Sequence, residues 1–181
     1  MKTLYKWSVE DYHRLIETGI LGTKRVELLE GEIIEVSPEQ PIHSYTNDMV
    51  AEYLRHKLSG LAKIREAHPI TLDNSEPEPD IAIVQLRNNN YRDRHPDAES
   101  IYWLIEIANK TLQTDLTYKS ITYARNGIAE YWVIDLPHSQ VWRFTQPLNN
   151  LYLQREAIKT GNINPLAFPE VNIEVEKLLV K

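Results

Sequence analysis

The sequence contains no cysteine among its 181 residues. Disulfide bonds and thiolate-bound zinc sites are therefore excluded. Glycine is scarce, at six residues, and none of the glycines forms the kind of loop that cradles phosphates. No serine lies in a nucleophile-elbow pattern, and no two histidines have the helical spacing of a zinc site. These absences exclude several common chemistries.

Long apolar runs are also missing. No stretch approaches the roughly 18 apolar residues that a membrane-spanning helix needs, and residues 1–8 are not followed by an apolar signal core. We therefore expect a soluble, cytoplasmic protein with no membrane partner. Hydrophobic residues make up 42% and charged residues 25% of the chain, as in ordinary globular proteins. The length predicts a single domain over residues 1–181.

Positive charge is in deficit. The chain has 20 Lys and Arg against 26 Asp and Glu, a formal net charge of −6. Nucleic-acid-binding domains are usually basic, because neutralising phosphates supplies most of their non-specific affinity. An acidic chain that acts on a phosphodiester needs bound metal cations or a local basic loop. The charge therefore argues against a passive nucleic-acid binder more strongly than against a metal-dependent nuclease.

Apolar periodicity predicts the order of the elements. A helix follows Ser8, a hairpin turns at Glu30-Gly31, and a second helix covers residues 43–59. That second helix has an apolar side made of Tyr45, Met49, Val50, Tyr53, Leu54 and Leu58. Strands are expected near residues 63–72, 80–86, 101–108, 131–134, 141–145 and 152–158, with helices at 114–125 and 173–179. This order predicts an α/β fold with a mixed central sheet flanked by helices.

Two carboxylates lie at unusual places in these strands. Glu106 interrupts the apolar strand 101–108, where a carboxylate is costly to bury unless it is paired or bound to a metal. The alternative is that Glu106 marks where the strand reaches solvent. Asp80 opens a strand directly after Pro79, and the alternative there is an ordinary strand-entry aspartate bonded to a backbone amide. Glu76 and Glu78, in the preceding turn, are expected to be solvated.

Lys119 is the third candidate. On the helix that starts at Thr114, Lys119 shares one face with Leu116 and Tyr123, so it should point toward the sheet. The alternative is a surface pair with Asp115, four residues earlier.

The three candidates together are chemically sufficient for phosphodiester hydrolysis. That reaction needs a cation that neutralises developing charge and lowers the pKa of the attacking water. Mg²⁺ prefers one or two carboxylates together with waters and substrate phosphates. A lysine beside them can orient the water or stabilise the transition state.

Several ordered motifs resemble the Uma-two family, a bacterial group of proposed endonucleases in the PD-(D/E)XK superfamily. They are Pro79-Asp80, Glu106 within residues 104–111, Asp115, Lys119, Tyr123, residues 130–135, residues 25–32 and Pro41-Ile42-His43. The resemblance implies a restriction-endonuclease-like α/β core, DNA as substrate and a Mg²⁺ (or Mn²⁺) ion. It implies that Asp80 and Glu106 are metal ligands and that Lys119 is the catalytic lysine. Glu27, His43, Asp115 and Tyr123 would be accessory residues.

The sequence departs from the superfamily pattern at one position. The lysine usually stands two residues after the second acid, where this chain has Ala108. Lys119 resembles a migrated lysine, and Lys110 is a weaker substitute. The loop 87–100 carries Arg87, Arg92 and Arg94, which are candidates for steering DNA, although a solvated basic loop is the ordinary interpretation.

Three functional hypotheses follow. The first is a metal-dependent DNA endonuclease, plausibly a homodimer, since one site cannot cut both strands without rebinding. The second is a non-catalytic module that keeps the nuclease fold to bind nucleic acid or protein, motivated by Ala108 and the acidic charge. The third is a hydrolase of smaller phosphate esters or nucleotides, which the negative charge would tolerate more easily than a long polyanion.

Overall fold

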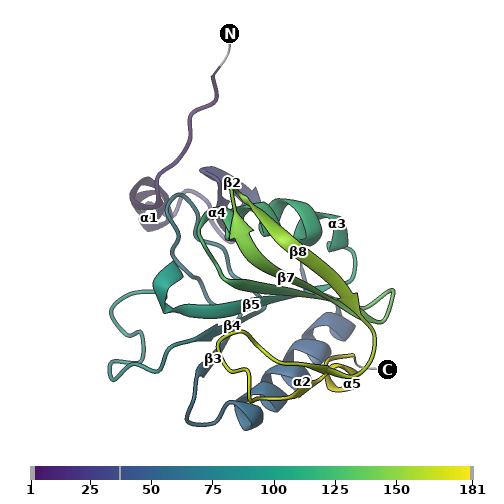
Figure 1. Ribbon diagram of the computed structural model, residues 1–181. Helices are drawn as coiled ribbons and strands as arrows, with labels where there is room; N and C mark the ends of the chain where they lie inside the picture. Colours follow the sequence, from purple (N-terminus) through teal and green to yellow (C-terminus); the bar gives the residue numbers. More distant parts are fainter. Residues whose placement is uncertain (1–2, 37, 180–181) are drawn as a thin grey trace.

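The computed structural model of the protein describes residues 3–36 and 38–179. Its centre is a six-stranded sheet in the order β3-β4-β5-β6-β7-β8 (Figure 1). The strands are β3 Lys63–Glu66, β4 Ile81–Val84, β5 Ile101–Ala108, β6 Glu130–Asp135, β7 Gln140–Leu148 and β8 Leu151–Ile158. β5 and β6 are parallel, and the other neighbouring pairs are antiparallel. The predicted mixed sheet is confirmed.

β5 has the bounds that its apolar run predicts, and the reason is burial on both faces. Trp103 and Ile105 belong to the core cluster on one side of the sheet, whereas Leu104 and Ala108 belong to the cluster on the other. A strand covered on both faces has no polar face to alternate with. Trp103 and Trp132 are fully buried and pack against each other at 5.4 Å between ring centroids, so both belong to the core.

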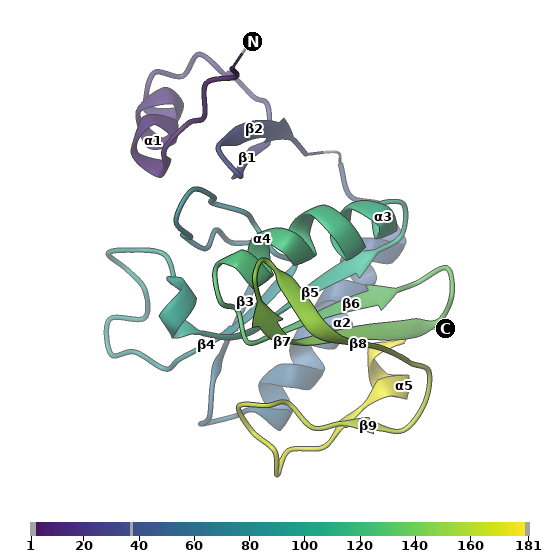
Figure 2. The same cartoon turned by 45° about the horizontal axis from the view of Figure 1, so that its top comes forward.

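Helices cover both faces of this sheet. On one side lie α2 Pro41–Lys57 and α5 Val175–Leu178. The other side carries a continuous helical segment made of α3 Leu112–Thr114, the π-helical turn η2 Asp115–Lys119 and α4 Ser120–Arg125 (Figures 1 and 2). This segment connects the parallel strands β5 and β6, which a tight turn cannot join. It begins after Thr111, three residues earlier than the predicted cap at Thr114.

The buried side of α2 differs from the prediction. Val50, Leu54 and Leu58, spaced four residues apart, are fully buried against the sheet. Tyr45 and Met49, which were expected on the same side, are 53% and 43% exposed. Met49 precedes Val50 by one residue, which is about 100° around a helix with 3.6 residues per turn. The contact stripe on α2 is therefore narrower than the apolar pattern suggests.

Residues 3–36 form an N-terminal unit above the α3–α4 segment (Figure 2). It contains α1 Val9–Glu17, capped by Ser8, and the hairpin of β1 Val26–Leu29 and β2 Glu32–Glu35. Glu30 and Gly31 both have positive φ, at 51° and 72°, as a type I′ hairpin turn requires. A Cβ at Gly31 would lie 2.9 Å from Lys6 Cβ, so this turn needs glycine.

Three other segments are more irregular than predicted. The strand expected over 63–72 ends at Glu66, because Ala67 has a positive φ of 44° and turns the chain. The helix expected over 173–179 begins only at Val175, since β10 Ile173–Glu174 pairs with β9 Asn162–Ile163. The loop 87–100 ends in a short 3-10 helix, Ala98–Ser100. Across the described residues, no helix is long and apolar enough to cross a membrane.

The α2 contact yields a stability prediction. Leu54→Ala removes a fully buried side chain and should lower the free energy of unfolding by about 2–5 kcal/mol. Met49→Ala, on the exposed side of the same helix, should change it by less than about 0.5 kcal/mol. Urea denaturation followed by circular dichroism measures both. Equal losses in the two variants would contradict the orientation of α2.

Candidate active site

Sheet register brings Asp80 and Glu106 together. β4 and β5 are antiparallel with Ile81 opposite Ile105, so one further step in this register places Asp80 opposite Glu106. The backbone N–H of Ile107 donates a hydrogen bond to Asp80 Oδ2 at 2.6 Å. An acid just before β4 and an acid near the end of β5 therefore meet at the same end of the sheet.

Glu106 is buried, with 2% of its surface exposed. Lys119 Nζ lies 2.9 Å from Glu106 Oε1, and the Tyr123 hydroxyl donates a hydrogen bond to the same oxygen at 2.7 Å. Lys119 and Tyr123 stand one helical turn apart, on η2 and α4, and both point toward the sheet as their spacing predicts. Lys119 thus contacts Glu106, and the alternative of a surface pair with Asp115 is wrong.

Burial and charge act in opposite directions on this pair. Burial raises the pKa of Glu106 well above its usual value, while the charge of Lys119 opposes that rise. For Lys119, burial alone would lower the pKa, but the surrounding carboxylates outweigh it and raise the pKa overall. Glu106 is the strongest of these carboxylates, followed by Glu27, Asp115 and Asp80. The ammonium is therefore held charged among several acids.

His43, on α2, supports Asp80 from the opposite side. Its Nε2 lies 3.0 Å from Asp80 Oδ2, and its Nδ1 lies 3.6 Å from Glu39 Oε2. Burial would lower the pKa of His43, but the hydrogen bond and charge of Asp80 outweigh it and raise that pKa. Asp80 therefore stabilises the protonated form of this imidazole.

Glu27 and Asp115 are buried acids near the same lysine. Glu27, on β1, is 5% exposed, and Asp115, at the start of η2, is 3% exposed. Burial raises the pKa of each carboxyl, and the charge of Lys119 opposes both shifts. Within the described residues, Asp115 Oδ2 is a buried oxygen without a hydrogen-bond partner. A buried oxygen of this kind calls for water, an ion or a ligand.

Six of the seven predicted site residues line one cleft of about 690 Å³: Glu27, His43, Asp80, Glu106, Asp115 and Lys119. Tyr123 lies beneath it, bonded to Glu106. The residues that the sequence reasoning missed include Arg25, Glu39, Glu78 and Tyr118. Glu78 was expected to be solvated, although it stands two residues before Asp80 on an extended segment, a spacing that places side chains on one side. Glu76, also expected to be solvated, is only 6% exposed.

A family model described as "Putative restriction endonuclease", Uma2, matches residues 9–176. The chain belongs to the Uma2 family. It is also similar to the crystal structure of a putative nuclease of the DUF820 group from Anabaena variabilis ATCC 29413, with a TM-score of 0.68 and 19% identity. That similarity covers 86% of this chain and 89% of the other, and it shows the fold. No curated protein matches the chain significantly.

In this Uma2 chain, position 108 is alanine, and a lysine from the neighbouring helical segment lies beside Glu106. Ala108 is fully buried in the cluster that contains Tyr123, on the same face of β5 as Leu104. That is also the face of Glu106, by the alternation of a strand. The α3–α4 segment packs over this face, so Lys119 reaches Glu106 from above. Lys110 is exposed and lines the cleft as well.

The three arginines of loop 87–100 do not line this cleft. Arg87 donates to Ser100 Oγ at 2.6 Å. Arg92 and Arg94 form ion pairs with nearby aspartates, at 2.8 Å to Asp93 and 3.5 Å to Asp97. These local partners hold the arginines on their own loop, and the steering role remains a prediction.

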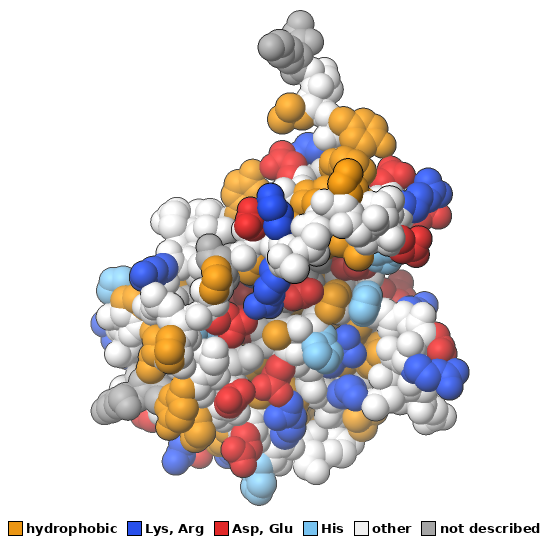
Figure 3. Space-filling view, turned by 180° about the vertical axis from the view of Figure 1, so that it is seen from behind, with side chains coloured by type: hydrophobic (Ala, Val, Ile, Leu, Met, Phe, Trp, Pro, Cys, Tyr) orange, Lys and Arg blue, Asp and Glu red, His pale blue; other side chains and the backbone are white. Residues whose placement is uncertain are grey.

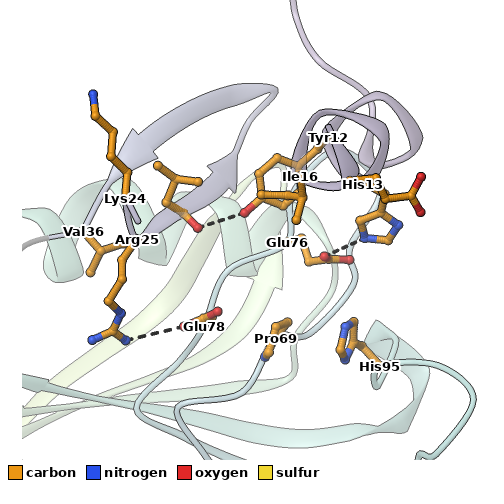
Figure 4. A pocket seen from close by; sticks show the side chains of 12 residues that line it. Tyr12, His13, Ile16, Lys24, Arg25, Val36, Pro69, Glu76, Glu78 and His95 are labelled. Carbon is orange, nitrogen blue, oxygen red and sulfur yellow. Dashed lines mark hydrogen bonds and ion pairs between the residues drawn. The ribbon is translucent and has the colours of Figure 1, made fainter. Parts of the chain in front are cut away.

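A second cleft of about 450 Å³ adjoins the first and shares Arg25, Val36 and Glu78 with it. Figure 4 shows His13 pointing toward Glu76 and Arg25 pointing toward Glu78, whereas Lys24 points away from the cleft. His13 Nε2 lies 2.7 Å from Glu76 Oε1, and Arg25 lies 3.7 Å from Glu78. Glu76 also accepts a hydrogen bond from Thr71 at 2.9 Å. This cleft therefore lies where the N-terminal unit contacts the turn before β4.

The donor set of the larger cleft fits a hard divalent cation. The hydrogen bonds and ion pairs to Asp80 and Glu106 fall on one oxygen of each carboxylate, Oδ2 and Oε1. Among the described residues, no three His, Asp or Glu side chains are arranged as a metal-binding group. Mg²⁺ needs only one or two carboxylates when waters and phosphate oxygens complete its shell. Asp80 and Glu106 are the residues that would hold it.

Replacing Lys119 should reveal the free-energy cost of burying the Glu106 carboxylate without a counter-ion. Lys119→Met leaves Glu106 without its counter-ion and should lower the free energy of unfolding by about 3–5 kcal/mol at neutral pH. Because burial raises the pKa of Glu106, the folded variant keeps a proton that the unfolded chain loses above its ordinary value of 4.5. Relative to the double variant Lys119→Met/Glu106→Gln, which has no carboxyl at this position, the deficit should therefore grow as the pH rises above 4.5 and shrink below it.

Denaturant titrations at several pH values measure this effect. The double variant Lys119→Met/Glu106→Gln serves as the control, because it removes the buried charge together with its partner. It should regain most of the lost stability and lose the pH dependence. A single variant with a deficit that does not change with pH would contradict the buried pair.

Proposed function

We propose that the chain is a divalent-metal-dependent endonuclease that hydrolyses phosphodiester bonds of DNA. The observation that carries this proposal is Lys119 Nζ, 2.9 Å from the buried carboxylate of Glu106, in the same cleft as Asp80. Two acids and a lysine at one sheet end are a sufficient set for this chemistry. Membership of the Uma2 family supports the reaction class.

Mg²⁺ or Mn²⁺ bound to the two carboxylates would supply charge neutralisation at the phosphate and an acidified water. Side chains and one backbone amide of the chain position the two carboxylates and the attacking water. His43 and the Ile107 amide fix the orientation of Asp80, and Tyr123 fixes that of Glu106. The Lys119 ammonium donates hydrogen bonds, so it orients the attacking water and stabilises the charge that develops on the phosphate.

The non-catalytic alternative is motivated by the alanine at position 108 and by the acidic charge. A lysine remote from both acids would favour it. Lys119 instead contacts Glu106 directly. A fold kept only for binding would also have no need for several buried acids around one lysine, because burying them costs stability. Comparing cleavage of plasmid DNA with hydrolysis of mononucleotide esters distinguishes DNA from smaller phosphate esters as the substrate.

The test is nicking of supercoiled plasmid by purified protein with Mn²⁺ or Mg²⁺. We expect the wild type to nick and Asp80→Asn to lose more than about 100-fold in rate, since even outer-shell partners of metal ligands are worth 10–100-fold. Asp48→Asn, an exposed change on α2, is the matched control and should keep full activity. Chelation of the metal should abolish nicking by both active proteins.

Equal nicking by Asp80→Asn and the wild type would contradict the proposal, because the activity would then come from a contaminant. Hydrolysis of mononucleotide esters without nicking would favour the smaller substrates. Absence of both activities would favour the non-catalytic binding module.

A further inference from the structure

The larger cleft has both charged and apolar lining. Its floor carries the acids of the sheet and Lys119. The hairpin and the chain after it form the hairpin wall, where the apolar side chains of Leu29, Ile34, Val36 and Pro38 stand beside the charged Glu27, Glu35 and Glu39. Contact with the phosphate backbone alone does not require an apolar wall. A wall of this kind buries apolar surface, which the planar faces of nucleobases provide.

Tyr118 adds an aromatic ring to the same cleft. It is 50% exposed, although it is adjacent in sequence to the buried Lys119. An exposed aromatic ring beside a reactive centre is a stacking platform for bases, because every base has a π-face. Tyr118 and Lys119, the residue proposed to contact the phosphate, line the same cleft.

The cleft has few cations available for a duplex backbone. Lys119 is engaged with Glu106, and Arg25 lies within 4 Å of both Glu39 and Glu78. Lys110 is exposed. Duplex binding through the backbone requires many neutralised phosphates. On the face shown in Figure 3, Lys and Arg side chains are scattered among Asp and Glu and form no continuous basic band.

We propose that the cleft binds one nucleotide of a single-stranded or unpaired stretch, with its base against the hairpin wall and stacked on Tyr118. This proposal rests on the proposed function and names its substrate class. The volume of about 690 Å³ is in the range of sites that enclose a small ligand. In a duplex the base is paired and stacked, so it must first be flipped out at an energetic cost. Single-stranded DNA therefore binds more tightly than the matched duplex.

The experiment compares Tyr118 with a matched tyrosine outside the cleft. Fluorescence anisotropy measures binding of a single-stranded oligodeoxythymidine of about 12 nucleotides and of its duplex with oligodeoxyadenosine, in Ca²⁺. Tyr118→Ala should weaken single-strand binding by about 5- to 150-fold, the value of one stacked base. Tyr118→Phe should keep it, because stacking needs the ring and not the hydroxyl. Tyr45→Ala, at a 53% exposed tyrosine on α2, should have no effect.

Salt dependence provides a second measurement. Binding held by stacking and few phosphate contacts should show a shallow slope of log affinity against log salt, about −0.7 for each neutralised phosphate on a single strand. A steep slope, equal affinity for duplex and single strand, or equal binding by Tyr118→Ala and Tyr45→Ala would overturn the proposal. Failure of the wild type to bind the single strand would do so too.

Hydrolysis of bis(p-nitrophenyl) phosphate with Mn²⁺, run in parallel, separates this proposal from the proposed function. Hydrolysis by the wild type with no preference for single strands would remove only the base-binding proposal. Selective single-strand binding without hydrolysis or plasmid nicking would remove only the endonuclease.

Discussion

The arrangement around β5 follows from the burial of one carboxylate. Glu106 is buried near the end of the central strand β5, in a sheet whose faces are both covered, where an unpaired charge would be very costly. Lys119 and Tyr123 contact Glu106 from the helical segment that covers this face. The need to pair the Glu106 carboxylate constrains how that segment crosses the sheet. The π-helical turn η2 ends at Lys119, and such turns occur frequently at functional sites. Lys119 therefore takes part both in the packing of the helical segment on the sheet and in the proposed chemistry.

Negative charge exceeds positive charge around Lys119 in the cleft. Four carboxylates, from Glu27, Asp80, Glu106 and Asp115, act on the single ammonium of Lys119. Burial raises the pKa of three of them, Glu27, Glu106 and Asp115, which expresses the cost of keeping negative charge there. A bound cation would offset that cost, because an opposite charge favours the ionised form. Under the proposed function, the cation held by these carboxylates would let an acidic chain accept a phosphodiester.

Much of the sheet and the central site could be predicted from the sequence. The apolar run of β5 and the acid inside it are local signals, and the spacing of Lys119 and Tyr123 is a property of one helix. Other features depend on distant contacts. The rotation of α2 is set by the sheet surface it meets, and the burial of Glu76 is set by His13, 63 residues away. Tyr118 gives no signal in the sequence, because whether a ring is exposed depends on what packs beside it.

The N-terminal unit contributes Glu27 and the hairpin wall, and its hairpin is attached to the turn before β4 by hydrogen bonds and to α4 by the Arg125–Glu30 ion pair. Glu76 N–H donates to Leu28 O at 2.7 Å, and Gly31 N–H donates to Asn74 O at 2.9 Å. The cleft is therefore assembled from two parts of the chain, the hairpin and the sheet with its helices. Its lining is complete only while the hairpin is docked.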